Sequence, residues 1–570
     1  MCKLTISGAC AVLVCGGLAY GKSGGDSRAD DEASAREQRV KEFCDGYLDK
    51  FAPLSRASAE AWWEAAVTGT DEAFARRKNA EAALLALHGD RETFAKLKEH
   101  RAADTELDPV LKRQLDVMYS AFLPKQGDPK LQERVLALEG EVDQIFNTHR
   151  SLVAGKELTE NEVREILSKS TGSTDAEAAW KGYMAVGAKI APKLKELVGL
   201  RNRIAREVGY ENFFSLKLAT QEIDEAELFK LFDELDALTR EPFAEVRGEI
   251  DRKMAARFGI AQSELRPWHF GDLFFQEAPD IQEVNLDDAF ADADILEAAR
   301  RYFASLGMPV DSILERSDLY EKKGKSPHAF CSDLDRTGDV RILCNLKPNT
   351  YWMDTLVHEL GHAVYDTNLR PDLPFNLRTA AHAITTEGIA MMFGAMVKTP
   401  EWYTGVLQMP KERAEQFARA AKAFLRTERL IFSRWAQVVL RFEHGLYTDP
   451  RQELGKLWWD LKKRYQLLPQ PDEAGRPDYA AKMHIVGEPV YYHCYMIGEL
   501  FASQVREYLC RNVAETADCR ETCFLGRTEV GEYLRDRVFG PGNMRPWYEL
   551  PLSATGERLS PKYFARHIAE

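Results

Sequence analysis

The stretch His358-Glu359-Leu360-Gly361-His362 decides what kind of fold the chain is expected to have. On a helix, histidines four positions apart lie one above the other on the same face, so both imidazoles can bind one Zn²⁺. The glutamate between them is then placed to act as general base on a water molecule. The alternative is an ordinary amphipathic helix with solvated or core histidines. The pattern favours a zinc peptidase.

The residues around this motif predict a helix over 351–367. Pro348-Asn349-Thr350 supplies its start, and apolar residues on its flanks would hold the histidines against a core: Leu356, Val357, Ala363 and Val364.

A catalytic zinc needs a third protein ligand, and position 368, where a third histidine would be a common solution, is Asn. Glu387 starts an apolar helical run 25 residues after His362, and we expect it to be that ligand. Asp366 and Asp372 compete for the role, although Asp366 is better suited to orienting a ligand histidine. A further alternative for Glu387 is a carboxylate favoured only by the helix dipole.

A short β hairpin is expected just before this helix. The β-prone run Val340-Arg341-Ile342-Leu343-Cys344 follows a turn-like segment at 335–339, and residues 328–334 precede that turn. An edge strand beside a metal can support an extended peptide backbone.

The rest of the chain has the apolar spacing of helices. Examples are 37–51, 72–88, 129–153, 176–208, 224–257, 285–306, 411–445 and 495–509. No clear linker or repeat interrupts them. We therefore predict a mainly α fold: one large helical gluzincin-type peptidase domain over 37–570, with a deep central groove and the hairpin beside the zinc helix.

The N-terminus has the features of a signal peptide. Lys3 precedes an apolar stretch over 4–18, and Ala19-Tyr20-Gly21 resembles a cleavage site. We expect a signal peptide over 1–21, a flexible lead-in over 22–36, and an exported protein, periplasmic or secreted. A lipoprotein signal at Cys10 or Cys15 ranks second, because the preceding residues fit it poorly.

Charge and hydropathy exclude several partners. The net charge of −14 argues against nucleic acid or an anionic membrane as the main partner. The body of the chain has no apolar run long enough for a transmembrane segment. Neither observation indicates an oligomeric state.

Seven cysteines follow the predicted signal peptide, and export would favour disulfides among them. Cys331 with Cys344 is one candidate pair. Cys510 with Cys519 or Cys523 is another. The odd number leaves at least one thiol over, and without export all seven would be reduced.

From about Trp268 onward, the ordered motifs resemble the angiotensin-converting-enzyme family of zinc dipeptidyl carboxypeptidases, in a divergent, bacterial-looking form. The family's His-Glu-Met-Gly-His falls on 358–362, with Leu for Met, and its glutamate ligand falls on Glu387. The intervening Asp-Leu-Pro and Leu-Arg recur at 372–374 and 377–378. The resemblance implies one Zn²⁺ per chain, bound by His358, His362 and Glu387, with Glu359 as base.

The resemblance also implies residues that act on the substrate. The family's His-Ala strand falls on His328-Ala329, where the strand carries substrate backbone. Its Lys-Phe-His falls on 482–484, so that His484 and His328 would bind the same substrate carbonyl. The second tyrosine of its Tyr-x-x-Tyr falls on Tyr495, which would stabilise the oxyanion.

A third motif implies a clamp for the substrate's free C-terminal carboxylate. In the family a Gln, a Lys and the first Tyr hold this group, and they fall on Gln276, Lys482 and Tyr492. A clamp at a fixed distance from the zinc would select for release of dipeptides. Taken singly, each of these residues could be an ordinary surface or core side chain.

Some positions depart from the family. The spacing from His484 is one residue longer, so Tyr491 and Tyr492 compete for the first tyrosine role. The chloride-binding Arg falls on Cys494, which makes chloride activation doubtful. A carboxylate one turn after the glutamate ligand falls on Met391, so ligand orientation would depend on another partner. Both candidate cysteine pairs lie near positions where the family has disulfides.

The predicted function is release of C-terminal dipeptides from short peptides by a zinc metallopeptidase. One alternative is an oligoendopeptidase with the same zinc residues and no use of the free C-terminus. Another is a zinc-containing peptide-binding protein without turnover, although a mere binder has no need of Glu359.

Overall fold

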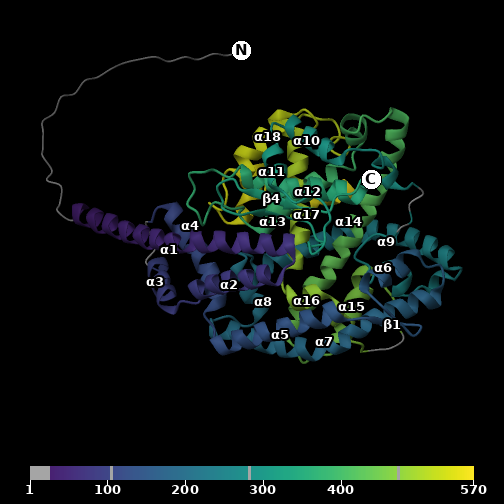
Figure 1. The fold of residues 1–570 in the computed structure, drawn as a ribbon, viewed down its shortest axis with the longest axis horizontal. Coiled ribbons are helices and arrows are strands. Elements are labelled where there is room, and N and C mark those ends of the chain that lie inside the picture. Colours follow the sequence, from purple (N-terminus) through teal and green to yellow (C-terminus); the bar gives the residue numbers. More distant parts are fainter. Residues whose placement is uncertain (1–25, 103–106, 280, 282–283, 472–474, 570) are drawn as a thin grey trace, which may run out of the picture.

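The described part of the chain is mainly helical, as the sequence predicts (Figure 1). The computed structural model describes residues 26–102, 107–279, 281, 284–471 and 475–569. The predicted signal peptide over 1–21 lies outside these residues. Helix α1 begins at Asp26, so the part of the predicted flexible lead-in from 26 to 36 is helical. This segment contains neither Gly nor Pro, and alanine, arginine and glutamate favour helix.

The first half of the chain forms nine helices and one hairpin within the described residues. The helices are α1 (Asp26–Thr68), α2 (Asp71–His88), α3 (Arg91–Ala102), α4 (Pro109–Phe122), α5 (Pro129–Thr148), α6 (Glu160–Lys169), α7 (Ser173–Glu207), α8 (Phe213–Thr220) and α9 (Glu225–Phe258). The antiparallel hairpin joins β1 (Ser151–Val153) to β2 (Lys156–Leu158).

The second half contains the predicted zinc helix. Its elements are α10 (Ile295–Ser305), α11 (Asp311–Arg316), β3 (Phe330–Asp333), β4 (Val340–Leu343), α12 (Thr350–Thr367), α13 (Ala383–Met396), α14 (Lys411–Thr448), α15 (Leu454–Gln466), α16 (Met483–Gly487), α17 (Tyr492–Tyr508), α18 (Thr528–Leu534), α19 (Leu550–Thr555) and α20 (Lys562–Ile568). In Figure 1, α12, α13 and α17 lie at the centre, between α10 and α18 above and α5 and α7 below.

Two predicted helices end earlier or begin later than their apolar spacing indicates. The range 129–153 was expected to be one helix, but α5 ends at Thr148 and the remainder enters β1. The range 285–306 contains a short 3₁₀ turn before α10, because the Asp294 side chain caps α10 by accepting the Glu297 N–H. In both places, a turn or a helix-capping side chain sets the end of the helix, although the apolar spacing continues beyond it.

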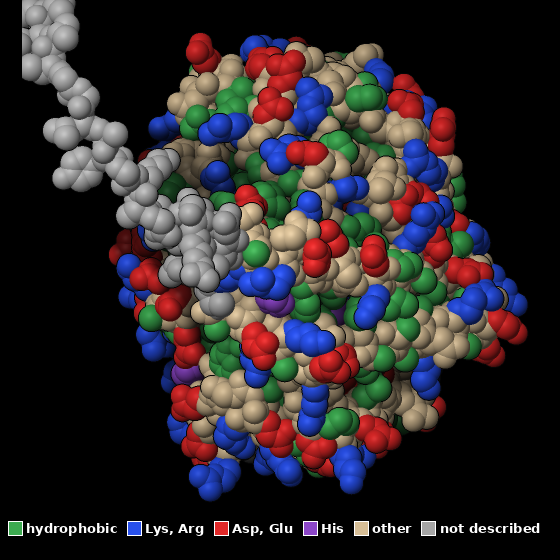
Figure 2. Space-filling view, turned by 90° about the vertical axis from the view of Figure 1, so that its left-hand side faces the viewer, with side chains coloured by type: hydrophobic (Ala, Val, Ile, Leu, Met, Phe, Trp, Pro, Cys, Tyr) green, Lys and Arg blue, Asp and Glu red, His purple; other side chains and the backbone are tan. Residues whose placement is uncertain are grey.

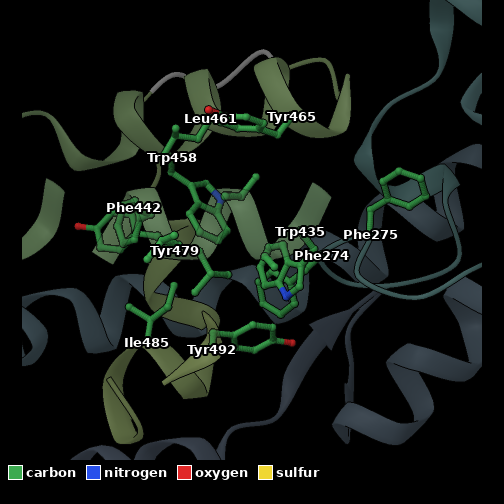
Figure 3. Packing of buried hydrophobic residues seen from close by; sticks show 14 of the residues in the cluster. Phe274, Phe275, Trp435, Phe442, Trp458, Leu461, Tyr465, Tyr479, Ile485 and Tyr492 are labelled. Carbon is green, nitrogen blue, oxygen red and sulfur yellow. The ribbon is translucent and has the colours of Figure 1, made fainter. Parts of the chain in front are cut away.

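Two large hydrophobic clusters form the core. The α7 cluster joins α5, α7, α9, α15 and most of α14, and Figure 3 shows its aromatic centre. The α12 cluster joins α10, α12, α13 and the start of α14. Helix α17 belongs to both, since Met496 packs in the α7 cluster and Val505 in the α12 cluster. The clusters are therefore connected through shared helices.

The predicted hairpin before the zinc helix is confirmed. Strands β3 and β4 pair antiparallel, with Asp333 opposite Val340, and the Asp335 side chain accepts the backbone N–H groups of Thr337 and Asp339 in the turn. The Phe330 ring packs on Trp62 of α1 at a centroid distance of 4.1 Å. Helix α1 thereby covers the hairpin.

Neither predicted disulfide is formed, because all seven described cysteines are free thiols. The strand register places Cys331 opposite Ile342, so Cys344 lies diagonal to it rather than directly across. Of the two partners considered for Cys510, Cys519 is its neighbour, since their thiols share a hydrogen bond. The Cys523 thiol instead contacts Glu401.

The surface has mixed charge. On the face shown in Figure 2, Lys and Arg side chains alternate with Asp and Glu, with no broad field of one sign. Within the described ranges, no helix combines the length and the apolar character that spanning a bilayer requires.

Candidate active site

Helix α12 carries the two histidines as the sequence predicts. It begins after Asn349, whose side chain accepts the Trp352 N–H at 2.9 Å. All four predicted flanking residues are buried in the α12 cluster: Leu356, Val357, Ala363 and Val364. The rings of His358 and His362 consequently lie together, with their centroids 4.9 Å apart.

Helix α13 brings Glu387 to the histidines. Its Oε2 lies 3.7 Å from Nε2 of His358 and 3.8 Å from Nε2 of His362, and one ligand atom from each residue falls within 4.8 Å of the others. The competing Asp372 instead forms an ion pair with Arg370 at the surface. The third candidate ligand is therefore brought to the site from a different helix.

Glycines allow the helices to approach this closely. A Cβ on Gly361, inside the quoted motif, would lie 2.9 Å from the Ala390 Cα on α13. A Cβ on Gly388, next to the third candidate ligand, would lie 2.7 Å from the Gly498 carbonyl oxygen on α17. Both positions leave no room for a larger residue without separating the helices.

The titration behaviour of these groups fits a bound dication. Burial lowers the pKa of His358 to about 4 and also lowers that of His362, so both imidazoles are neutral at pH 7. Burial raises the pKa of Glu387 to about 7, because removal from water disfavours the ionised carboxylate. Two neutral imidazoles and a carboxylate are a ligand set that suits Zn²⁺, whose charge would stabilise the ionised glutamate.

His362 is oriented by a residue that the sequence interpretation missed. Its Nδ1 lies 2.7 Å from the Thr386 hydroxyl, which leaves Nε2 facing Glu387. Asp366, the predicted orienting residue, instead faces the charges of Asp333 and Arg336, and its burial raises its pKa to about 8. No sequence pattern identified Thr386, because its role depends on how α13 packs against α12.

Glu359 lies beside the cluster and under the hairpin. Its carboxylate accepts the backbone N–H of Cys331 on β3 and faces the charge of Glu387. Burial, followed by that neighbouring charge, raises the pKa of Glu359 to about 8. A carboxyl group with a pKa near neutrality can both take up and release a proton.

The three clamp candidates lie in one group. Lys482 Nζ donates to Gln276 Oε1 at 2.6 Å, and the Tyr492 hydroxyl donates to the same oxygen at 3.4 Å. Figure 3 shows Tyr492 near Trp435 and Phe274, and Lys482 lies over the rings of all three. Between the two competing tyrosines, Tyr492 is therefore the one that faces Gln276.

The remaining substrate-binding and catalytic candidates do not all lie together. Some lie near the clamp, some face Glu387, and one is at the surface. The His484 ring lies 5.4 Å from that of Tyr492, which in turn contacts Tyr495 at 5.5 Å. Tyr491 and Tyr495 both face the charge of Glu387. His328 is exposed just before β3, and Ala329 packs against the α12 cluster. The structure thus groups His484 with the clamp, and it leaves the His328 side chain at the surface.

The sequence model of the family described as angiotensin-converting enzyme, peptidase M2, matches residues 34–562. The chain belongs to the angiotensin-converting enzyme family. The match covers every candidate site residue named above, all of the α12 cluster and the α7 cluster except Phe564 and Ile568.

Curated relatives of this angiotensin-converting enzyme family member are distant. An angiotensin-converting enzyme-like protein, Ace3, of Mus musculus is 23% identical over 72% of this chain and 59% of its own length. An angiotensin-converting enzyme-related protein of Drosophila melanogaster is 22% identical over 50% of this chain and 48% of its own length. Carboxypeptidase 1 of Bacillus subtilis (strain 168) is 22% identical over 42% of this chain and 52% of its own length. Each match thus spans about half of the relative, or little more.

In this angiotensin-converting enzyme family member, a carboxylate that the sequence interpretation did not consider lies near His358. Met391 offers no carboxylate, but Asp354 lies one helical turn before His358 and its charge acts on that imidazole. Lys398 forms an ion pair with Asp354, and Gly394 leaves space for the Asp354 carboxylate. The spacing of Asp354 and His358, four residues apart on a predicted helix, was a signal that sequence reasoning could have used.

Proposed function

We propose that this protein hydrolyses peptide bonds in short peptides, using one Zn²⁺, and that it releases C-terminal dipeptides. The observation that carries the proposal is the convergence of His358, His362 and Glu387 beside the buried carboxyl group of Glu359. The separate group around Lys482 supports the choice of dipeptide release.

The chemistry of hydrolysis is assigned to residues around the metal cluster. A Zn²⁺ bound there would polarise the scissile carbonyl and activate water. Glu359 takes the proton of the attacking water and delivers it to the departing amine. The Tyr495 hydroxyl donates a hydrogen bond to the oxyanion, and burial raises the pKa of Tyr495, which keeps this proton in place.

The clamp sets which bond is cut. Lys482, Gln276 and Tyr492 bind the C-terminal carboxylate of the substrate. Burial lowers the pKa of Lys482 to about 8, so most of this lysine remains charged at pH 7. His484, whose pKa is lowered by burial to about 4, is a neutral donor for a carbonyl of the released residues, and His328 would join it there.

The first experiment compares a peptide with a free C-terminus and its amidated form, with and without a chelator, by mass spectrometry of the products. Sequential loss of dipeptides from the free peptide only, abolished by the chelator, is the expected result. Internal cleavage of both forms would instead assign an oligoendopeptidase. Zinc binding without cleavage of either would assign a peptide-binding protein.

Replacing the clamp cation isolates its contribution. Lys482→Met should lower kcat/KM for the free peptide by about 10- to 100-fold, because a hydrogen-bonded charge is lost. It should leave the already poor amidated peptide unchanged. The exposed Lys456, which forms an ion pair with Asp460, provides the control Lys456→Met. Equal losses on both peptides would contradict the clamp.

Export is part of the proposal, with residues 1–21 as a cleaved signal peptide. N-terminal sequencing of the mature protein should find a start at or near Lys22. Recovery of the intact N-terminus from the cytoplasm would contradict export.

A further inference from the structure

A cavity with a strongly basic lining lies apart from the candidate active site. Its volume is about 240 Å³, and it is enclosed by the end of α13, α14, α17 and the C-terminal helix α20. Seven of its sixteen lining residues are Lys or Arg, and two are Glu. In a chain whose net charge is −14, this local excess of positive charge needs an explanation.

Two buried arginines contribute the cavity's least accessible charges. Arg506 on α17 is 5% exposed and Arg429 on α14 is 7% exposed. The Nε atom of Arg506 has no hydrogen-bond partner among the described residues. Arg429 forms an ion pair with Glu499, with Nε 3.3 Å from Oε2. Within the described residues, Arg506 instead donates to a neutral group, the Thr522 carbonyl, at 3.2 Å. Within the described residues, no carboxylate forms an ion pair with Arg506.

The nearest acidic residue in sequence does not neutralise Arg506. Glu507 forms ion pairs with two other cations, Arg511 and Arg566, and its Oε2 lies 3.1 Å from Nε2 of His567. Burial and the neighbouring charge of Arg429 lower the pKa of Arg506, as expected for a guanidinium without a counter-charge. Burying such a charge is unfavourable unless an anion accompanies it.

Further Lys and Arg side chains line the walls and the mouth of the cavity. Lys398 is buried in the wall, but its charge is matched by Asp354. Arg426 donates through Nε to the Ile568 carbonyl at 2.8 Å, which ties α14 to α20. Arg419 and Lys422 are exposed at the mouth. An anion entering the cavity would pass these two residues before reaching Arg506.

We propose that this cavity is a binding site for a small oxyanion of the phosphate class, held by Arg506 and Arg429 at its floor. Guanidinium groups match tetrahedral oxyanions because several N–H groups donate in one plane. The volume of about 240 Å³ is ample for phosphate and too small for a folded partner. The site is independent of the proposed peptidase activity.

Thermal unfolding of the full-length protein, with inorganic phosphate as the probe, tests the proposal. Phosphate should raise Tm more than chloride at equal ionic strength, and Arg506→Gln should lose the excess shift, which separates binding from the general stabilising effect of phosphate salts. The shift should persist with a chelator present, which separates this site from the metal cluster. No greater shift with phosphate than with chloride would overturn the proposal.

Variants assign the binding to the cavity. Arg506→Gln should raise Tm in the absence of phosphate, because an uncompensated buried charge is removed. It should also weaken the Kd for phosphate, measured calorimetrically, by at least tenfold. The partly exposed Arg426→Gln is a second variant in case Arg506→Gln fails to fold. The remote, exposed Arg134→Gln on α5 is the control. Equal phosphate binding by Arg506→Gln and the unaltered protein would contradict the assignment.

Two further measurements define the ligand and keep the two proposals separate. Phenyl phosphate binding as tightly as inorganic phosphate would assign a phosphate monoester, and weaker binding would assign the free ion; both support the site. Peptide hydrolysis should survive Arg506→Gln, and phosphate binding should survive Glu359→Gln. Loss of phosphate binding in Glu359→Gln would contradict a separate site.

Discussion

Glu359 is the residue on which the proposed chemistry depends most directly. Replacing it with glutamine keeps the shape and removes the proton acceptor. Glu359→Gln should lower kcat by at least about 10²-fold, the lower range for general acid–base catalysis, while zinc remains bound. Steady-state kinetics with metal analysis of the same sample tests this. Unchanged turnover would contradict the assignment, and loss of zinc would show that Glu359 has a structural role instead.

Glu387 determines how zinc binding should depend on pH. Its pKa of about 7 lies above the value of 4.5 of an exposed glutamate, so the folded, metal-free protein holds a proton there that the unfolded chain has lost. Stability of the metal-free protein therefore falls as pH rises from about 4.5 to 7. A zinc ligand must be ionised, so zinc must displace this proton below pH 7.

Zinc affinity should consequently rise about tenfold per pH unit between pH 5 and 7 and level off above it. His358 does not contribute over this range, because its pKa of about 4 leaves it neutral. Competition with a chelator, corrected for pH, measures the effect. The Glu359→Gln background removes the second carboxyl group that titrates nearby. A flat profile from pH 5 to 7 would contradict the role of Glu387.

At the scale of elements, the close approach of α13 to α17 positions the site. Glu387 lies on α13 and Tyr495 on α17, and the contact between Gly388 and Gly498 sets their separation. Gly388→Ala should destabilise the protein by about 1–3 kcal/mol, because the new Cβ meets a backbone oxygen rather than a flexible side chain. It should also lower activity at temperatures where the variant is fully folded.

Gly199→Ala on α7 is the matched control, because a Cβ there meets nothing within 4 Å. This change at an exposed position of α7 should be neutral or stabilise by up to about 1 kcal/mol. Urea unfolding of both variants gives the comparison. If Gly388→Ala proved as stable as Gly199→Ala, the packing of the two helices would not require glycine.

At the scale of the whole molecule, the shared helices α14 and α17 should make the two hydrophobic clusters unfold together. Leu446→Ala removes a fully buried side chain from the α7 cluster only and should cost about 2–5 kcal/mol. Hydrogen exchange of the α10 and α12 amides should then accelerate, although these helices lie in the α12 cluster.

The exposed Leu136, on helix α5, which also contributes to the α7 cluster, provides the control. Leu136→Ala should leave exchange in α10 and α12 unchanged. Retained protection of these amides in Leu446→Ala would show that the clusters unfold as independent units.

Several features follow from the sequence by itself. Apolar spacing predicts most helices, including α9 to within a residue at each end. The five residues from His358 to His362 imply the zinc helix, and the turn at Asp335 predicts the hairpin. These features depend on interactions within a few residues along the chain, such as caps, turns and helix faces, which a sequence displays directly.

Only the tertiary structure decided the rest, because it depends on which surfaces meet across the fold. That Tyr492 rather than Tyr491 reaches Gln276, and that Thr386 rather than Asp366 contacts His362, follows from helix packing over long sequence separations. The stagger of Cys331 and Cys344 depends on strand register. The basic cavity assembles side chains from α14, α17 and α20, whose charges appear unremarkable in sequence until burial removes their water.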